Sequence, residues 1–230
     1  MLSANEWWKV IADYNNSLFP YQFIVMALGL MLTGMVLLIQ KNQKWTVAMK
    51  AYLATCNICI GVVFFILSEG FMSPMKDAQG GLFLAIGALY IVDIFNKKSV
   101  FVLPKSKLQK IVTLVLLSLT FLYPVFGLLE GHDLHHLIFI GTLPCATTAL
   151  GLILCSTSVR RVNKVLYVLM LVWALPFPLA VQVPKYGVYE DLIMFASGIF
   201  AVVMLAITVV KACMARSIKD VYSEKQDVSV

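Results

Sequence analysis

Long apolar runs separated by short polar segments are the dominant pattern along this chain. A transmembrane helix needs roughly 17–25 consecutive, mainly apolar residues, and runs of that length recur from one end of the sequence to the other. Each run is expected to be a helix, because a lipid-facing backbone must satisfy its own hydrogen bonds. The predicted spans cover residues 21–40, 51–68, 79–96, 111–129, 137–155, 165–183 and 191–210.

The charged residues between the spans predict their orientation. The segments after spans one, three, five and seven hold most of the cations, whereas the other side holds three lysines and most of the acids. Positive charge is retained in the cytoplasm, so the N-terminus is predicted outside and the C-terminus in the cytoplasm. The cations on the predicted inner side are Lys41, Lys44, Lys50, Lys97, Lys98, Lys105, Lys107, Lys110, Arg160, Arg161, Lys164, Lys211, Arg216, Lys219 and Lys225.

The residues ahead of the first span predict a short additional helix. Ser3 and Glu6 have the spacing of a capping box, and aromatic and aliphatic residues then recur on one face. Tryptophans favour the membrane–water interface, so residues 1–19 are expected to form an interfacial helix that anchors span one. A lid over an outer cavity is the alternative. The residues of this face are Trp7, Trp8, Ile11 and Tyr14.

Composition supports the membrane assignment. Of 230 residues, 60% are hydrophobic and 13% are charged, whereas soluble domains have about 45–50% apolar and about 25% charged residues. The formal charge of +6 is spread over inter-span clusters, so no nucleic-acid partner is predicted.

The expected fold is all-α, a single domain over residues 1–230. It is an integral membrane bundle of seven transmembrane helices with a cytoplasmic tail at 212–230, and its partner is the lipid bilayer.

Helix-breaking and polar residues collect in the predicted outer half of the bundle. Pro124, Pro144, Pro176 and Pro178 all lie there, and broken helices at membrane depth usually surround a cavity. Polar groups inside a membrane are costly and are often functional. Two interpretations stay open: an outward-facing pocket, or helix ends packed together without a cavity. The polar residues at this level are Tyr123, Glu130, His132, Asp133, Cys145, Thr147, Thr148 and Gln182.

All three histidines stand close together, at His132, His135 and His136. Their HxxHH spacing is that of a di-iron histidine box, but membrane di-iron enzymes need about eight histidines, so that class is excluded. A smaller metal site with His132 and Cys145 is an alternative, since imidazole and thiolate ligands suit copper, zinc or mercury. Cys56 and Cys59 stand one turn apart in span two, although free cysteines are also common as small core residues.

Two segments resemble a family of bacterial multi-pass membrane proteins described only as a domain of unknown function. The segment from Tyr14-Asn15 to Pro20-Tyr-Gln22 is similar to the family's N-terminal signature. The second signature is matched by Tyr123-Pro124, Gly131-His132 and Pro144-Cys145-Ala146-Thr147-Thr148. Phe19 stands where the family has tryptophan and Ala146 where it has proline, so the start of span five should be less kinked.

The resemblance implies a shared site but names no ligand, activity or cofactor. Because both motifs enter their spans from the outer side, we expect them to meet in the fold. The candidate binding residues are Tyr14, Asn15, Gln22, Tyr123, His132, Pro144, Cys145, Thr147 and Thr148. Binding or transport of a small solute or metal ion, in the bacterial cytoplasmic membrane, is the leading hypothesis. A membrane sensor or accessory subunit is the alternative, and an enzyme is the third class.

Overall fold

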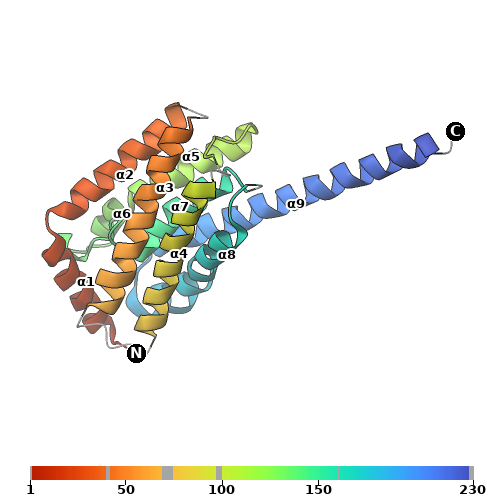
Figure 1. Ribbon diagram of the computed structural model, residues 1–230. Helices are drawn as coiled ribbons and strands as arrows, with labels where there is room; N and C mark the ends of the chain where they lie inside the picture. The colour runs from red at the N-terminus through yellow and green to blue at the C-terminus, as the bar shows by residue number, and fades with distance from the viewer. Residues whose placement is uncertain (1, 40–41, 69–74, 97–99, 160, 228–230) are drawn as a thin grey trace.

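The computed structural model describes residues 2–39, 42–68, 75–96, 100–159 and 161–227, and these residues contain helices and loops without a β-strand. Figure 1 shows a bundle from which the last helix extends as a long arm. The elements, in chain order, are α1 (Ala4–Leu18), α2 (Tyr21–Leu38), α3 (Gln43–Cys59), the π-helical η1 (Ile60–Ile66), α4 (Lys76–Asn96), α5 (Lys107–Phe121), α6 (Tyr123–Leu129), the short 3₁₀ turn η2 (Leu134–His136), α7 (Pro144–Ser156), α8 (Lys164–Ala174), the π-helical η3 (Pro178–Tyr186) and α9 (Asp191–Asp227).

Five helical segments in the described residues are long and apolar enough to cross a membrane, and a sixth qualifies if one bent pair counts as a single span. The bend, of 60°, separates α5 from α6. It falls just before Pro124, whose ring cannot continue a regular helix. The five unbent segments are Tyr21–Leu38, Gln43–Ile66, Lys76–Asn96, Lys164–Tyr186 and Asp191–Met214.

The prediction of a continuous helix over residues 137–155 is wrong. Residues 137–143 are not helical, and α7 has only 13 residues, or about 20 Å at about 1.5 Å per residue, which is too short for a hydrocarbon layer about 30 Å thick. Gly141 has a φ of 90°, and Leu143 is extended because the following Pro144 disfavours a helical conformation. Hydropathy could not reveal this break, since the unwound residues are as apolar as the helix.

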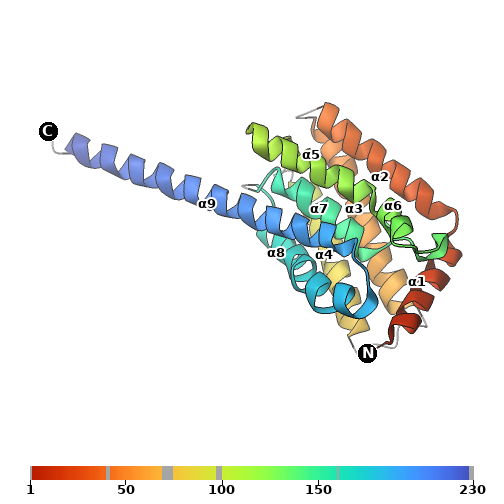
Figure 2. The ribbon, with the colours of Figure 1, turned by 180° about the vertical axis from the view of Figure 1, so that it is seen from behind.

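The short helix α7 lies in the centre of the bundle. All 13 of its residues are buried, and it packs against α3, α5, α8 and α9. The view from behind shows it among these helices (Figure 2). An unwound backbone at membrane depth is tolerated where protein surrounds it, and the position of α7 meets that condition.

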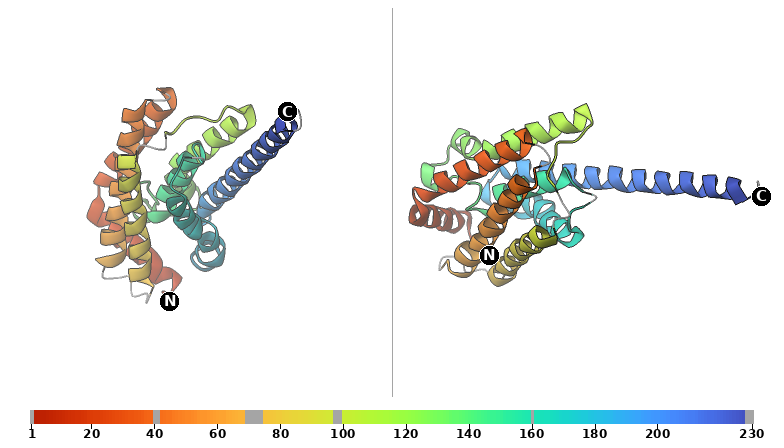
Figure 3. Two further views of the ribbon diagram at one scale, coloured as in Figure 1. Left: turned by 45° about the vertical axis from the view of Figure 1, so that its right-hand side comes forward. Right: turned by 45° about the horizontal axis from the view of Figure 1, so that its top comes forward.

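Helix α1 lies across one end of the bundle, which we call the α1 end (Figure 3). The predicted capping box is present, with the Ser3 side chain and Glu6 bonded reciprocally. The expected apolar face faces protein, however, since Trp7, Ile11 and Tyr14 are buried. The lid alternative requires such packing on the bundle, while the position of α1 relative to the lipid headgroups stays a prediction.

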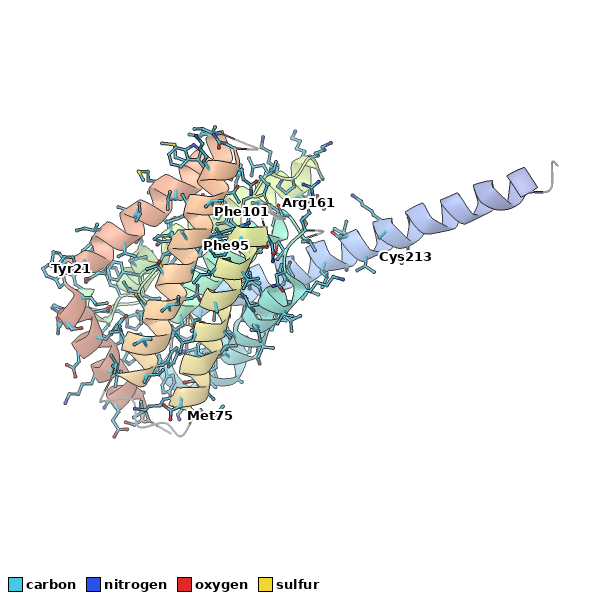
Figure 4. All side chains as sticks on the ribbon, viewed as in Figure 1. Tyr21, Met75, Phe95, Phe101, Arg161 and Cys213 are labelled. Carbon is cyan, nitrogen blue, oxygen red and sulfur yellow. The ribbon has the colours of Figure 1, made fainter. Side chains whose placement is uncertain are left out.

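The labelled side chains mark the two ends of the bundle and the projecting part of α9. Figure 4 places Met75 at the α1 end, Phe95 and Arg161 towards the opposite end, and Cys213 on the α9 arm. The predicted tail over residues 212–230 is helical as far as Asp227. Helix α9 continues well past the other helices, as Figures 1 and 2 show.

A buried ion pair joins α3 to α4 inside the bundle. The Nζ atom of Lys50 lies 2.8 Å from Oδ2 of Asp93, and both side chains are buried. Lys97 stands one helical turn after Asp93 in the sequence and is the local partner expected from spacing alone, but it lies outside the described residues. The pairing with Lys50 connects two different helices, so it fixes α3 against α4 as well as neutralising the charge.

We expect Lys50→Met to destabilise the protein by about 3–5 kcal/mol, because it leaves the Asp93 carboxylate buried without its cation. The thermal unfolding midpoint in detergent measures the effect. Lys50→Met combined with Asp93→Asn should recover much of the loss, and Lys44→Met, an exposed position on the same helix, should have little effect. A single variant as stable as the native chain would contradict this assignment.

Candidate functional site

The two sequence motifs meet at the α1 end, as expected. The Tyr14 hydroxyl donates to the carbonyl oxygen of Thr142 (3.0 Å). The Asn15 amide donates to the carbonyl oxygens of His135 (2.8 Å) and Leu137 (2.9 Å). The predicted contact between the N-terminal segment and the entry to α7 is therefore confirmed. These bonds satisfy carbonyl groups that the non-helical backbone leaves free.

The threonines of the second motif also serve the unwound segment. The hydroxyl of Thr147 accepts from the backbone N–H of Gly141 (2.8 Å) and donates to the carbonyl oxygen of Leu143 (2.7 Å). Thr147 thus joins the first turn of α7 to the residues ahead of it. Thr148 is buried, and its hydroxyl has no hydrogen-bond partner among the described groups. Pro144 begins α7, where its missing N–H costs nothing.

A largely apolar pocket of about 630 Å³ lies between α1, α2 and α3, and the turn at Gly141 and Thr142 closes one side of it. Tyr14 and Gln22 are the two predicted binding residues in its wall; Asn15, Tyr123, His132, Pro144, Cys145, Thr147 and Thr148 are not part of that wall. Its lining residues are Tyr14, Leu18, Tyr21, Gln22, Val25, Leu28, Leu32, Ala48, Ala51, Tyr52, Thr55, Cys56, Cys59, Val63, Gly141 and Thr142.

Gln22 is the distinctive polar group of this pocket. The residue is 2% exposed, and its carbonyl oxygen Oε1 has no hydrogen-bond partner among the described groups. A buried amide without a partner costs roughly 1–3 kcal/mol. The carbonyl is therefore an acceptor without a partner in a mainly apolar wall, which also contains the hydroxyl-bearing residues Tyr14, Tyr21, Tyr52, Thr55 and Thr142.

A second polar group, which we call the acidic cluster, lies on the other side of α1. It consists of Glu130, His132, Glu190 and Asp191. One potential ligand atom from each of Glu130, His132 and Glu190 lies within 4.8 Å of the others. His132 Nε2 is 3.7 Å from a carboxylate oxygen of Glu130. The Trp8 ring packs over the His132 ring at a centroid distance of 4.3 Å.

Two loops bring these residues together. Glu130 caps the C-terminus of α6, and Gly131, with a φ of 90°, turns the chain so that the His132 N–H reaches the carbonyl oxygen of Gly127 (3.0 Å). Glu190 and Asp191 stand at the start of α9, where the helix dipole favours negative charge. The Tyr123 hydroxyl donates to Asp191 (3.4 Å), and Asp191 also interacts with the Cys145 thiol.

Burial changes the acid–base behaviour of the cluster. Glu190 is 2% exposed, and this burial, together with the neighbouring carboxylates of Glu130 and Asp191, raises the pKa of Glu190 to about 9. Burial also lowers the pKa of His132, although nearby Glu130 opposes the shift. The two shifts have the same main cause, because burial disfavours the charged form of each side chain.

The structure separates the two metal-ligand candidates suggested by the sequence. His132 belongs to the group with Glu130 and Glu190, whereas Cys145 does not belong to it and instead contacts Asp191. Sequence reasoning counted Glu190 and Asp191 only as outer-side charges. Their position directly ahead of an apolar run was the available signal, but it does not distinguish a buried carboxylate from a solvated one.

Five helices in the described residues that are long and apolar enough to cross a membrane indicate a multi-pass membrane protein. The chain belongs to the family of unknown function DUF6064, whose model matches residues 4–216. The resemblance to a family of unknown function is thereby confirmed, while the individual motif signatures stay untested. No curated protein and no solved structure matches the chain.

We expect Asn15→Ala to lower stability by about 1–3 kcal/mol, because two backbone carbonyls in the unwound region lose their donor. Thermal unfolding in detergent is the measurement. Asn16→Ala is the matched control, since Asn16 is the neighbouring exposed amide on the same helix. Equal midpoints for the two variants would show that the Asn15 bonds do not hold the segment in place.

Proposed function

We propose that this protein is a multi-pass protein of the bacterial cytoplasmic membrane that binds a small, mainly apolar solute in the pocket between α1, α2 and α3. The single observation that carries the proposal is the Gln22 carbonyl, buried without a partner in an apolar pocket. Ligand sites are typically apolar cavities of about 300–1,000 Å³ with a few polar groups that orient the ligand.

The wall of the pocket defines the chemistry of the ligand. Most lining groups are aliphatic or aromatic, so they favour a hydrocarbon body. The Gln22 oxygen accepts a hydrogen bond, so the ligand should carry one hydroxyl or N–H donor. Fatty alcohols and quinols are compounds of this kind. Because binding is the first step of transport, the proposal extends to transport of the same solute across the membrane.

A thermal-shift screen of fatty alcohols and quinols in detergent tests binding. We expect members of these classes to raise the unfolding midpoint of the native chain. Thr55→Phe should abolish the shift, because Thr55 lines the pocket from an exposed position and the ring would fill the space. Ile24→Phe, which adds a ring to an exposed position of α2 outside the pocket wall, should leave the shift intact. Equal shifts in both variants would mean that the compounds act through the detergent.

We expect Gln22→Met to weaken binding of a responding alcohol about tenfold, since one hydrogen bond contributes roughly 1–1.5 kcal/mol. Methionine keeps the length of the side chain but removes the acceptor. Titration of the native and variant proteins with the same alcohol measures the ratio of dissociation constants. The methyl ether of that alcohol, which lacks the donor, serves as the control ligand and should bind both proteins alike. A ratio near one would remove Gln22 from the proposal.

The charge asymmetry supports an orientation with α1 outside and the C-terminus in the cytoplasm. After Val230, we expect a reporter that works only in the cytoplasm to be active and one that works only outside to be inactive. Ahead of Ser3, we expect the opposite. The reverse pattern would overturn the orientation and move the pocket to the cytoplasmic side.

A membrane sensor or accessory subunit is the second candidate function. One observation favours it: α9 runs from Asp191 to Asp227 and extends beyond the bundle. A projecting helix offers a surface for a partner protein. Removal of residues 215–230 separates the two candidates, because solute binding should survive the truncation whereas binding of a partner to the arm should not.

A further inference from the structure

The acidic cluster has an arrangement of ligand atoms that the solute pocket does not explain. Glu130, His132 and Glu190 each offer one atom, and the three atoms lie within 4.8 Å of one another. Two ligand atoms that each stand about 2.1 Å from the same ion are at most about 4.2 Å apart. Small side-chain rotations would therefore bring the three atoms to bonding distance from one ion.

An independent observation points to a missing partner. The Glu190 residue is 2% exposed, and neither of its carboxylate oxygens has a side-chain hydrogen-bond donor among the described groups. The Nε2 atom of His132, which faces this group, is also buried without a hydrogen bond. Buried polar groups are normally hydrogen-bonded or bound to metal. A cation between them would satisfy the carboxylate and the imidazole together.

The surroundings hold the ligands in place and leave a route to them. The Gly131 turn and the Trp8 ring position the imidazole of His132. A hollow of about 490 Å³ lies beside His132, and Lys9, Asp133 and His136 are among its lining residues. This hollow would let an ion reach His132 from the aqueous phase at the α1 end.

We propose that Glu130, His132 and Glu190 form a binding site for one divalent first-row transition-metal ion, with Zn²⁺ as the reference ion. One imidazole nitrogen and two carboxylate oxygens suit Zn²⁺, Mn²⁺ or Fe²⁺, whereas Cu⁺ favours thiolates. Three protein ligands leave a coordination position open for water or a bound solute. This site is separate from the solute pocket of α1, α2 and α3 and does not depend on it.

Calorimetric titration with ZnCl₂ tests the site in the full chain, purified in detergent, stripped with a chelator and freed of any histidine tag. We expect one Zn²⁺ per chain, and a loss of affinity of at least about 100-fold in Glu190→Gln and in His132→Asn. The double variant His135→Ala, His136→Ala is the matched control, because it removes the neighbouring histidines without touching the proposed ligands, and it should bind as the native chain does. The metal-free unfolding midpoint of each variant establishes that it is folded, and Glu190→Gln keeps the test available if His132→Asn does not fold.

The absorption spectrum with Co²⁺ in place of Zn²⁺ identifies the ligands. Nitrogen and oxygen ligands give d–d bands without a thiolate charge-transfer band, and this is the expected spectrum. A thiolate band would assign Cys145 to the ion and overturn the proposed ligand set. Loss of binding in the His135/His136 control, unchanged binding in Glu190→Gln, or no binding of Zn²⁺ at all would overturn the site itself. None of these outcomes bears on the solute screen.

Discussion

The hydrogen bonds of one unwound segment govern the arrangement of the α1 end. Residues 137–143 lie next to the most buried helix of the bundle, yet they are not helical, although the Leu143 N–H donates to the carbonyl oxygen of Phe139 (3.2 Å). Each buried carbonyl left without a donor would cost roughly 1–3 kcal/mol. Asn15 and Tyr14 supply donors from α1, and Thr147 supplies a donor and an acceptor from α7. Helix α1 is therefore part of the core of this fold.

The same helix contacts three further irregular segments, η1, η2 and η3. Trp7 and Tyr14 pack against Phe64 of η1, and Trp7 stacks on Tyr186 of η3. The indole N–H of Trp8 donates to the carbonyl oxygen of Tyr186 (3.0 Å). One amphipathic helix therefore packs against the π-helical segments η1 and η3 as well as against the unwound residues ahead of α7. Backbone groups at a helix break lack helical hydrogen-bond partners, and buried polar side chains can supply those partners. Polar side chains therefore collect where the breaks are.

The sequence predicts several of the long helices because continuous apolar runs are typical of helices that cross a membrane. The span expected at 21–40 corresponds to α2 (Tyr21–Leu38), and the span expected at 191–210 lies within α9. Hydropathy does not measure helicity, so it does not reveal that residues 137–143 are unwound. Gly141 and Pro144 are the residues in the sequence that point to a break in the helix. The meeting of Tyr14 and Asn15 with this segment followed from topology alone, since both motifs enter from one side.

The acidic cluster could not be predicted in the same way. Glu130 and Glu190 are far apart in sequence, and each stands in a short loop where a solvated acid is the ordinary expectation. Their proximity depends on how α6 bends away from α5 and on where α9 begins, and both depend on three-dimensional packing. His132 was recognised from its motif, but its neighbours were sought among cysteines, because sequence spacing favours residues on the adjacent span. The structure replaces that choice with two carboxylates.

Helix α1 also connects the two candidate sites physically. Trp8 packs over His132 of the acidic cluster, and Tyr14, fewer than two turns further along the same helix, lines the solute pocket. Both residues belong to the same continuous helix of 15 residues, which begins with a capping box. Tyr14 in turn bonds to Thr142, which lines the pocket beside Gly141. The two candidate sites therefore share one helix as a structural support, although they use different residues of it.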